Sequence, residues 1–427
     1  MEKKQNTGAF NLGWKGLVIV ILGFVSCYVY SALTSDSLNV TIGVFGKMGL
    51  PTSALYAMST VATVCGILGS ILFGKLMTMS TASKMWALSM ILTGVFAVVW
   101  SFTNSVAIYA VGYLVCYTLT LVSAMLLGYQ VIANWFPKKR GVAVGIATAG
   151  YPLSAATTTA VCSAFVTKFH GVQAYYIFIA VISFAVGFII LFFAKDFPEE
   201  KGAYPDNNRD FDFEEAAKEH QANLEYLKTS KWTIKKCLTT GRMWILWVAV
   251  GIGGFLSMGI MSNFVGKFML VNGYQMPQIL GMLAIAGIVA IPGSMFVGFL
   301  DVKLGTKKAG LIVNILAFLA ILFNLTPSTP LHYISLPILG VMLGGSSNLM
   351  VSCTEAIWGR YDFRAAFRVI QPLNAIMTGV GITVVGVIGN GTAAGYLHAY
   401  QFMLVLAAVA ILFMAILKVE PIDQDVR

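Results

Sequence analysis

The chain of 427 residues is long enough to form two or three soluble domains. Its composition excludes that arrangement, because 58% of the residues are hydrophobic and only 11% are charged, with a mean hydropathy of +0.79. Apolar stretches of roughly 20 residues are long enough to cross a bilayer as helices, and backbone in lipid must satisfy its hydrogen bonds internally. The sequence therefore predicts an all-α, multi-pass membrane protein.

Twelve apolar spans are predicted, six on each side of a hydrophilic insertion. They cover residues 15–35, 52–76, 84–103, 106–133, 141–167, 173–194, 243–270, 278–300, 308–326, 332–354, 366–389 and 396–417. We expect an N-terminal six-helix half (1–194), a cytoplasmic linker with a short amphipathic helix (195–242) and a pseudo-symmetric C-terminal six-helix half (243–427).

The distribution of basic residues explains the net charge of +10. Of the 28 Lys and Arg, only Lys47, Lys168 and Lys267 fall on the outer side of the predicted topology. This bias is typical of a membrane protein with both termini in the cytoplasm, so the charge predicts orientation and no nucleic-acid partner. We expect a protein of the cell (inner or plasma) membrane, functional as a monomer, with the bilayer and its substrate as partners.

Cysteine and histidine spacing gives no sign of a prosthetic group. The six cysteines form no CxxC pair and the four histidines are scattered along the chain. This pattern predicts neither a disulfide framework nor a metal site. No cofactor is expected.

Two elements recur at an offset of 224 residues. Gly74 and Gly298 each close an apolar stretch and precede a short basic hairpin, and Arg140 and Arg364 lie in the hinges after spans 4 and 10. In a membrane chain an internal repeat is typical of a transporter whose substrate path lies between the repeats. Orientation by positive charge would explain the arginines, but not the shared offset.

The motifs at these positions carry a family resemblance. Gly298-Phe-Leu-Asp-Val-Lys-Leu-Gly-Thr-Lys-Lys308 is similar to the Gly-x-Leu…Asp…Gly…Arg/Lys signature of the major facilitator superfamily, which the six-plus-six plan resembles over essentially the whole chain. The first-half copy departs from it, with Thr78 and Thr81 near the usual acid and glycine positions. Asn134-Trp-Phe-Pro-Lys-Lys-Arg-Gly141 resembles the oxalate:formate antiporter and monocarboxylate transporter branch.

The resemblance implies alternating access, in which the halves rock about a central site. Prolines kink helices and free backbone carbonyls, so they suit either a hinge or a fixed bend. We assign conformational or gating roles to Gly74, Arg140, Pro152, Gly298, Asp301, Lys303, Arg364 and Pro372.

The resemblance also implies a central cavity lined mainly by spans 1, 4, 7 and 10. Polar side chains on membrane helices usually face the bundle interior, although single Ser, Thr and Gly residues also serve helix packing. On span 11, Gln371 and Asn374 lie one turn apart and offer amide donors. The predicted substrate-binding residues are Tyr30, Tyr117, Thr120, Asn263, Ser347, Gln371, Asn374 and Arg368.

Carboxylates are scarce at the predicted membrane depth. Asp36 is the one acidic residue between positions 16 and 195, and it is expected at the outer end of span 1. A proton-coupled pump usually keeps a carboxylate or histidine inside the membrane, so uniport or exchange is favoured. A proton-coupled symporter that uses Asp36 or Glu355 is the alternative if a helix is shifted.

Cations that could hold an anion are equally scarce. Members of the resembled branch hold the substrate carboxylate with a cation on span 8, and span 8 of this chain has no Lys or Arg. Arg368, at the cytoplasmic start of span 11, is the candidate partner, with membrane orientation as its alternative role. Otherwise tyrosines, amides and helix dipoles hold the substrate, which suits a larger amphipathic carboxylate.

The sequence thus predicts a secondary transporter, not an enzyme. Its expected substrate is a small or amphipathic organic anion of monocarboxylate type, moved by uniport or exchange. Export of neutral or amphipathic compounds is the alternative. A membrane enzyme would need clustered His, Asp, Glu or Cys, a solute sensor normally adds a signalling domain, and no Gly-rich nucleotide loop is present.

Overall fold

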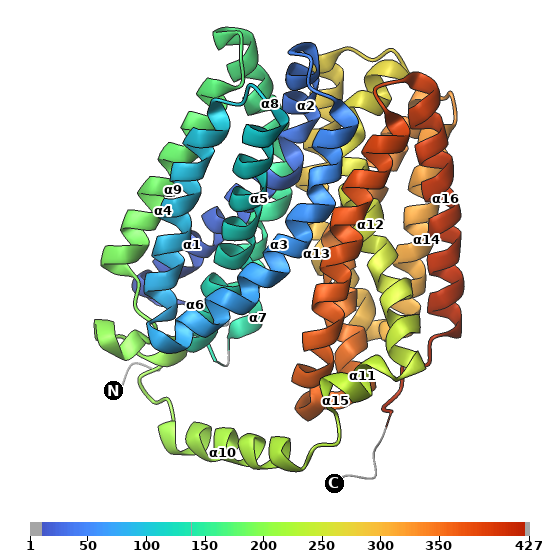
Figure 1. The fold of residues 1–427 in the computed structure, drawn as a ribbon. Coiled ribbons are helices and arrows are strands. Elements are labelled where there is room, and N and C mark those ends of the chain that lie inside the picture. Colours follow the sequence, from blue (N-terminus) through green and yellow to red (C-terminus); the bar gives the residue numbers. More distant parts are fainter. Residues whose placement is uncertain (1–10, 138, 423–427) are drawn as a thin grey trace, which may run out of the picture.

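The computed structural model describes residues 11–137 and 139–422, which form helices joined by short loops (Figure 1). The first half consists of α1 (Gly13–Ser31), η1 (Ala32–Asp36), α2 (Leu38–Lys47), α3 (Thr52–Met79), α4 (Ala82–Ser101), α5 (Val106–Val122), η2 (Ser123–Leu127), α6 (Gly128–Trp135), α7 (Arg140–Thr148), α8 (Gly150–Phe169) and α9 (Gln173–Phe193). The second half consists of α12 (Gly241–Leu270), α13 (Met276–Leu304), α14 (Thr306–Leu325), α15 (Thr329–Gly389) and α16 (Ala393–Ile416). The predicted all-α fold is confirmed.

Residues 195–240 connect the halves at the end of the bundle where the first and last described residues lie (Figure 1). We call this end the linker side and the opposite end the far side. The connection contains the short helices η3 (Pro198–Lys201), η4 (Pro205–Asn207), α10 (Phe213–Thr229) and α11 (Ile234–Leu238).

Ten helices of the described chain are long and apolar enough to cross a membrane. The pair Thr329–Ser346 and Asn348–Gly359, bent by 42°, makes an eleventh span. It is followed within α15 by the span Ala365–Gly389, and non-helical Gly359 (φ 71°) separates the two. The twelfth predicted span is the α7–α8 pair, whose many Ala, Gly, Ser and Thr residues lower its hydropathy. Small residues suit a helix that packs closely against others, here α1 and α13.

The internal repeat is visible in the helix boundaries. Helix α3 begins at Thr52 and α13 at Met276, and α4 covers Ala82–Ser101 where α14 covers Thr306–Leu325. All three boundary pairs differ by 224 residues, the offset that the sequence motifs predicted. The two hairpins therefore occupy equivalent positions in the two halves.

Each half has its own buried core. One core is formed by buried residues of the range 12–194 together with Ile382, and two others lie mainly among the helices of the second half. Helices of the second half approach closely at small residues, since a Cβ on Gly381 would collide with the Phe255 carbonyl and one on Gly344 with the Ala290 carbonyl. Such contacts hold helices together where lipid gives no hydrophobic driving force.

The helical chain continues beyond the end of span 1. The apolar stretch long enough to span is Gly13–Asp36, which agrees with the predicted 15–35, and helix α2 then continues to Lys47. In the structure Ser35, Asp36 and Thr41 are buried against other helices, so tertiary packing and not exposure accounts for them.

The linker contacts both hinges. Asp206 accepts a hydrogen bond from the Lys139 amide at 2.7 Å, beside the hinge before α7. At the other end, Tyr226 Oη and Ser230 Oγ donate to the two carboxylate oxygens of Asp362 at 2.8 and 2.5 Å. The equivalent hinges of the two halves are thus joined through one segment.

Candidate substrate site between the two halves

The two halves are joined by hydrogen bonds near the far side. Thr60 Oγ1 on α3 donates to Thr383 Oγ1 on α15 at 2.8 Å, and Thr383 Oγ1 donates to the Tyr56 carbonyl at 2.9 Å. A Cβ on Gly379 would collide with Thr63, and one on Gly386 with the Tyr56 ring. Helices α3 and α15 are therefore in backbone-close contact here.

Asn39 makes a second connection across the far side. Its Nδ2 donates to the Met261 carbonyl at 2.6 Å, and its Oδ1 accepts from the Val265 amide at 3.2 Å. Met261 O and Val265 N are the pair that bond each other in a regular α-helix. The side-chain amide of Asn39 thus bonds a carbonyl and an amide group of α12 that are one helical turn apart.

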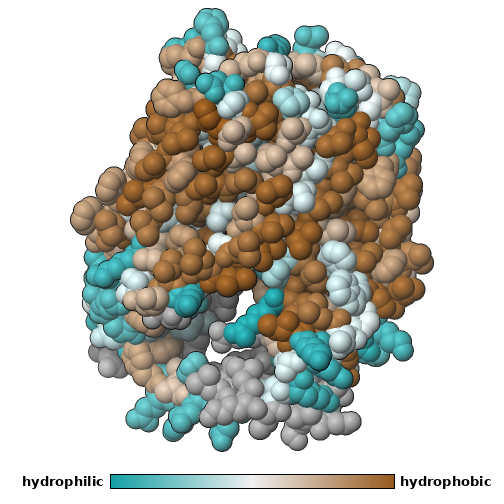
Figure 2. All heavy atoms as spheres, viewed as in Figure 1, coloured by the Kyte–Doolittle hydropathy of each residue, from teal (hydrophilic) through white to brown (hydrophobic). Residues whose placement is uncertain are grey.

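On the linker side the halves separate. Apart from the linker itself, every hydrogen bond between the halves that joins two residues with described side chains lies at the positions named above. A hollow opens between the halves at this end of the molecule (Figure 2). The structure is therefore closed on the far side and open on the linker side.

Tyrosine side chains gather on the first-half helices that the resemblance assigns to the cavity. Tyr30 contacts Tyr117 and Tyr151 edge-on, at centroid distances of 5.8 and 5.9 Å. The hydroxyls of Tyr30 and Tyr117 are 3.5 Å apart, and those of Tyr129 and Tyr151 are 3.3 Å apart. The π-helical turns η1 and η2 interrupt the two helices that carry most of this cluster, and such turns are frequent at functional sites.

Two other predicted binding residues, Thr120 and Asn263, bond the backbone of their own helices. Thr120 is fully buried, and its hydroxyl donates to the Cys116 carbonyl of its own helix at 2.7 Å. Asn263 is 1% exposed; its Nδ2 donates to Gly259 O, and its Oδ1 is buried without a partner. The side chain of Ser347 lies outside the described residues.

Arg368 lies on the face of α15 that is turned toward the first half. Gly379 and Gly386 on this face contact α3, and Ile382 belongs to the first-half core. Eleven residues make about three turns of helix, so Arg368 shares the face of Gly379 but lies toward the linker side. Its side chain is exposed, because the halves have separated at this depth.

Gln371 and Asn374 lie on α15 between Arg368 and Gly379. Both residues are partly exposed, and their side-chain amides make no hydrogen bond to a described side chain or backbone group. Asn374 lies near α12, since a Cβ on Gly254 would come within 3.3 Å of its Oδ1. Two uncommitted amides are thus available beside the hollow.

The predicted gating residues have mixed surroundings. A Cβ on Gly74 or Gly298 would have no atom within 4 Å, so this conformation gives no steric reason for glycine there. Asp301 has a buried Oδ1 without a partner, and Lys303 lies 5.4 Å from the Phe299 ring centroid. Pro152 and Pro372 lie inside α8 and α15. The side chains of Arg140 and Arg364 lie outside the described residues.

Asp36 lies at the end of the candidate span Gly13–Asp36, as expected, but it is buried among other helices. Asp36 is 3% exposed, and Ser154 Oγ donates to its Oδ2 at 2.6 Å. Ser154 lies midway along the α7–α8 pair, which covers residues 140–169. Asp36 is covered because a further helix, α2, follows it. Glu355, the other acidic candidate, is exposed.

Lys267 does not face the hollow. It is fully buried inside the second half, where its Nζ donates to Asn272 Oδ1 at 2.9 Å and to the Asn324 carbonyl. The ring of Phe268 lies 4.0 Å from the same nitrogen. This lysine therefore joins far-side loops of the second half and is not placed to hold a substrate between the halves.

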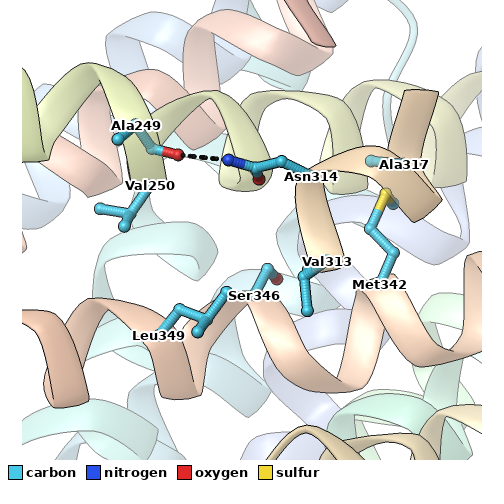
Figure 3. Close-up of a pocket in the computed structure, with 9 residues that line it drawn as sticks. Ala249, Val250, Val313, Asn314, Ala317, Met342, Ser346 and Leu349 are labelled. Atoms are coloured by element: carbon cyan, nitrogen blue, oxygen red, sulfur yellow. Dashed lines mark hydrogen bonds between the residues drawn. The ribbon is translucent and has the colours of Figure 1, made fainter. Parts of the chain in front are cut away.

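A small void lies within the second half, between α12, α14 and α15 (Figure 3). Its volume is about 10 Å³, and Val250, Asn314, Met342 and Ser346 are among its lining residues. Asn314 Nδ2 donates to the Ala249 carbonyl at 3.2 Å. A void of this size holds one water molecule at most, so it is no substrate site. Among the described residues no His, Cys, Asp and Glu cluster could hold a metal ion.

Sequence reasoning missed the residues that close the far side. Asn39 lies beyond the predicted end of span 1, and Thr60 and Thr383 are single polar residues in apolar helices. The sequence feature that could have indicated Asn39 is the run of polar residues after position 33, which is followed by an apolar stretch that is helical in the structure. Tyr129 and Tyr151 also follow no face pattern, because they come together from different helices.

Sequence comparison places the chain in a family. The model of the Major Facilitator Superfamily matches residues 16–367. The chain belongs to the major facilitator superfamily. No match is found among curated proteins.

Solved structures of other superfamily members share this fold. A bacterial homologue of the human lysosomal transporter Spinster, in an inward-facing and unoccupied conformation, is 14% identical, with 96% of this chain and 97% of that chain covered and a TM-score of 0.68. The occupied, inward-facing form of the same homologue is 12% identical, with 94% of this chain and 96% of that chain covered and a TM-score of 0.69. A mutant of the nucleoside transporter NupG is 13% identical, with 94% of this chain and 99% of that chain covered and a TM-score of 0.66.

These findings establish a multi-pass membrane protein with the fold of two six-helix halves. Membership of the superfamily and its transporter neighbours indicate a secondary transporter and not an enzyme. The far-side contacts and the linker-side hollow correspond to one of the two end states that alternating access requires.

Proposed function

We propose that the protein moves a small or amphipathic organic anion, of monocarboxylate type, by alternating access through uniport or exchange. The observation that carries this proposal is the position of Arg368. Arg368 is an exposed cation on the face of α15 turned toward the first half. It lies on the linker side of Gln371 and Asn374, whose side-chain amides make no hydrogen bond to described groups. A guanidinium binds a carboxylate with two parallel hydrogen bonds.

The tyrosine cluster supports the other end of such a substrate. Phenol rings give apolar surface together with a hydroxyl donor, so Tyr30, Tyr117 and Tyr151 would contact an amphipathic carboxylate on the first-half side. The hinge resemblance to the oxalate:formate antiporter and monocarboxylate transporter branch agrees with this substrate class. The remaining binding and gating residues keep the roles predicted from the sequence.

The orientation that we propose places the linker side in the cytoplasm of a cell-membrane protein that works as a monomer, with domain boundaries after residues 194 and 242. Lys47, Lys168 and Lys267 lie toward the far side, as the positive-inside rule requires. The described state would then be inward-facing, the state in which both Spinster-homologue structures were solved.

Export of neutral or amphipathic compounds is the second candidate. It is favoured by the exclusion of Lys267 from the hollow, which leaves few cations on the described surfaces between the halves.

Counterflow into proteoliposomes separates the two candidates. We expect saturable uptake of a labelled monocarboxylate, stimulated by unlabelled carboxylate inside, with at least a tenfold loss in Arg368→Ala. The matched control is Lys84→Ala, which removes an exposed cation at the start of α4. Uptake that survives in Arg368→Ala would remove this residue from the site. If the folded protein takes up no carboxylate, the anion proposal is wrong and the exporter is favoured.

A further inference from the structure

Residues 418–422 follow α16 and fold back onto the linker-side end of the second half. We call them the post-α16 segment. The Ile422 amide donates to the Ile357 carbonyl of α15 at 2.9 Å, and Arg242 Nη1, at the start of α12, donates to the Glu420 carbonyl at 2.9 Å. The Ile422 side chain also packs against the buried core at this end. The segment therefore joins α12 to α15 through two of its own backbone groups.

The acceptor of the first bond lies at a break in α15. Gly359 has φ 71° and ψ 173°, a combination that is essentially restricted to glycine. The helix before the break ends at Gly359, and the next span begins at Ala365. Carbonyls in the last turn of a helix have no donor within that helix, and Ile357 lies two residues before Gly359. The post-α16 segment thus supplies a donor to the last turn before the break.

Helices α12 and α15 also make the far-side hydrogen bonds to the first half. Asn39 bonds one turn of α12, and Thr383, in the part of α15 after the break, bonds α3. Opening the far side must move both of these regions away from the first half. Gly359 is the one residue in the described backbone of α15 with non-helical dihedral angles, so it is the available pivot for the part that follows it.

The internal repeat indicates that the second-half hinge has another bonding arrangement. In the first half, Trp135 ends α6, and its Nε1 donates at 2.9 Å to the carbonyl of Lys195, just after α9. At the offset of 224 residues this tryptophan corresponds to position 359, next to Trp358. The Nε1 of Trp358 is buried and has no partner among the described residues. A buried indole N–H usually has a partner, so a rearranged hinge can offer Trp358 a carbonyl of the post-α16 segment, as the first half offers Trp135 that of Lys195.

We propose that the post-α16 segment is a state-dependent latch. Its bond to Ile357 holds the break at Gly359, and with it the linker-side-open arrangement, and the segment detaches from Ile357 when the linker side closes. The proposal rests on the alternating access of the proposed function but not on the identity of the substrate. Because coupled equilibria are reciprocal, a change that weakens the latch favours the closed linker side, and a change that closes the linker side releases the latch.

Two readouts follow the conformation and the latch in substrate-free nanodiscs. Spin labels at Ser80→Cys and Lys308→Cys report the linker-side distance between the halves, and labels at Met48→Cys and Gln275→Cys report the far-side distance. All four positions are exposed. Cys65 is changed to Ser, because it is partly exposed while the other five cysteines are buried. Hydrogen exchange of the post-α16 segment reports whether it is docked.

Ile422→Pro removes the amide donor, and Ile422→Val, which keeps it, is the matched control. We expect the population with a closed linker side to rise about fivefold in Ile422→Pro, as the loss of one hydrogen bond predicts, and to stay at the parent value in Ile422→Val. Gly359→Ala should act in the same direction and also speed exchange of the segment, because alanine disfavours the break. Its control is Gly281→Ala, since a Cβ at Gly281 in α13 would have no atom within 4 Å.

The decisive variant is remote from the segment. Asn39→Ala weakens the far-side contact, and the resulting shift in population should speed exchange of the post-α16 segment by the same factor. Unchanged exchange in a variant whose linker-side distance has shortened would overturn the proposal, because a merely structural segment stays docked in both states. Ile422→Pro with the distance distribution of the parent protein would overturn it as well, whatever Asn39→Ala shows.

These outcomes are distinguishable from failure of the proposed substrate. All samples are free of substrate, so failure of carboxylate counterflow with the shifts intact would count against the substrate class and not against the latch. Distances that stay the same in the parent and in every variant would contradict both the latch and alternating access.

Discussion

Replacing Asn39 by Ala should shift the protein toward the state that is open on the far side. The side chain of Asn39 makes two hydrogen bonds to α12, to Met261 O and Val265 N. Each is worth about 1 kcal/mol net. After loss of the amide, those two backbone groups can bond each other as in a regular helix, which offsets part of the cost in the closed state.

The expected loss is therefore about 1–2 kcal/mol of far-side closure, or about 5- to 30-fold in the equilibrium constant between the two states. Spin-label distances between residues 48 and 275 measure this ratio directly. Asn314→Ala is the matched control, because Asn314 also donates to two helix carbonyls, those of Ala249 and Ala410, but both lie within its own half. The control should lower thermal stability without changing the ratio. A ratio unaltered in folded Asn39→Ala would show that this amide does not hold the far side closed.

Three further changes test separate parts of the structure. Gly379→Leu should prevent far-side closure, because a Cβ there already collides with Thr63 and overpacking costs about 1–3 kcal/mol or more; a distance distribution like that of the parent protein would contradict this contact. Asp362→Ala should release the second-half end of the linker, which loses two charge-assisted hydrogen bonds of about 1.5–3 kcal/mol each, so trypsin should cleave the linker faster than in the parent. Burial, with a contribution from Asp362, raises the pKa of the Cys237 thiol to about 11. Because the thiolate is the reactive form, the rate of alkylation of Cys237 should rise about tenfold per pH unit up to that value. Rapid labelling at neutral pH would refute the burial of this thiol.

The sequence was most informative where one local pattern decides the structure. Apolar length predicted the spans, and the Gly74 and Gly298 motifs predicted the offset at which α3 and α13 begin. The first feature depends on the hydrophobicity of one continuous stretch, and the second on a repeat of such stretches. Both can therefore be recognised without knowing which distant residues are in contact.

Positions set by packing between distant segments were less predictable. Asp36 is predicted at the outer end of span 1, and its burial depends on contacts with Ser154 and Thr159, which lie more than a hundred residues away in the sequence. The partnership of Thr60 with Thr383 likewise joins residues 323 positions apart. For Arg368 the helix face is readable only once Gly379 and Gly386 are known to contact α3.

In the mechanism that we propose, the two halves rock, so that the site opens to one side at a time. The most direct measurement records two distances under the same conditions, between residues 48 and 275 on the far side and between residues 80 and 308 on the linker side. Alternating access predicts that Asn39→Ala lengthens the first distance and shortens the second in the same molecules. Distances that change independently, or a far side that opens while the linker side stays open, would contradict it.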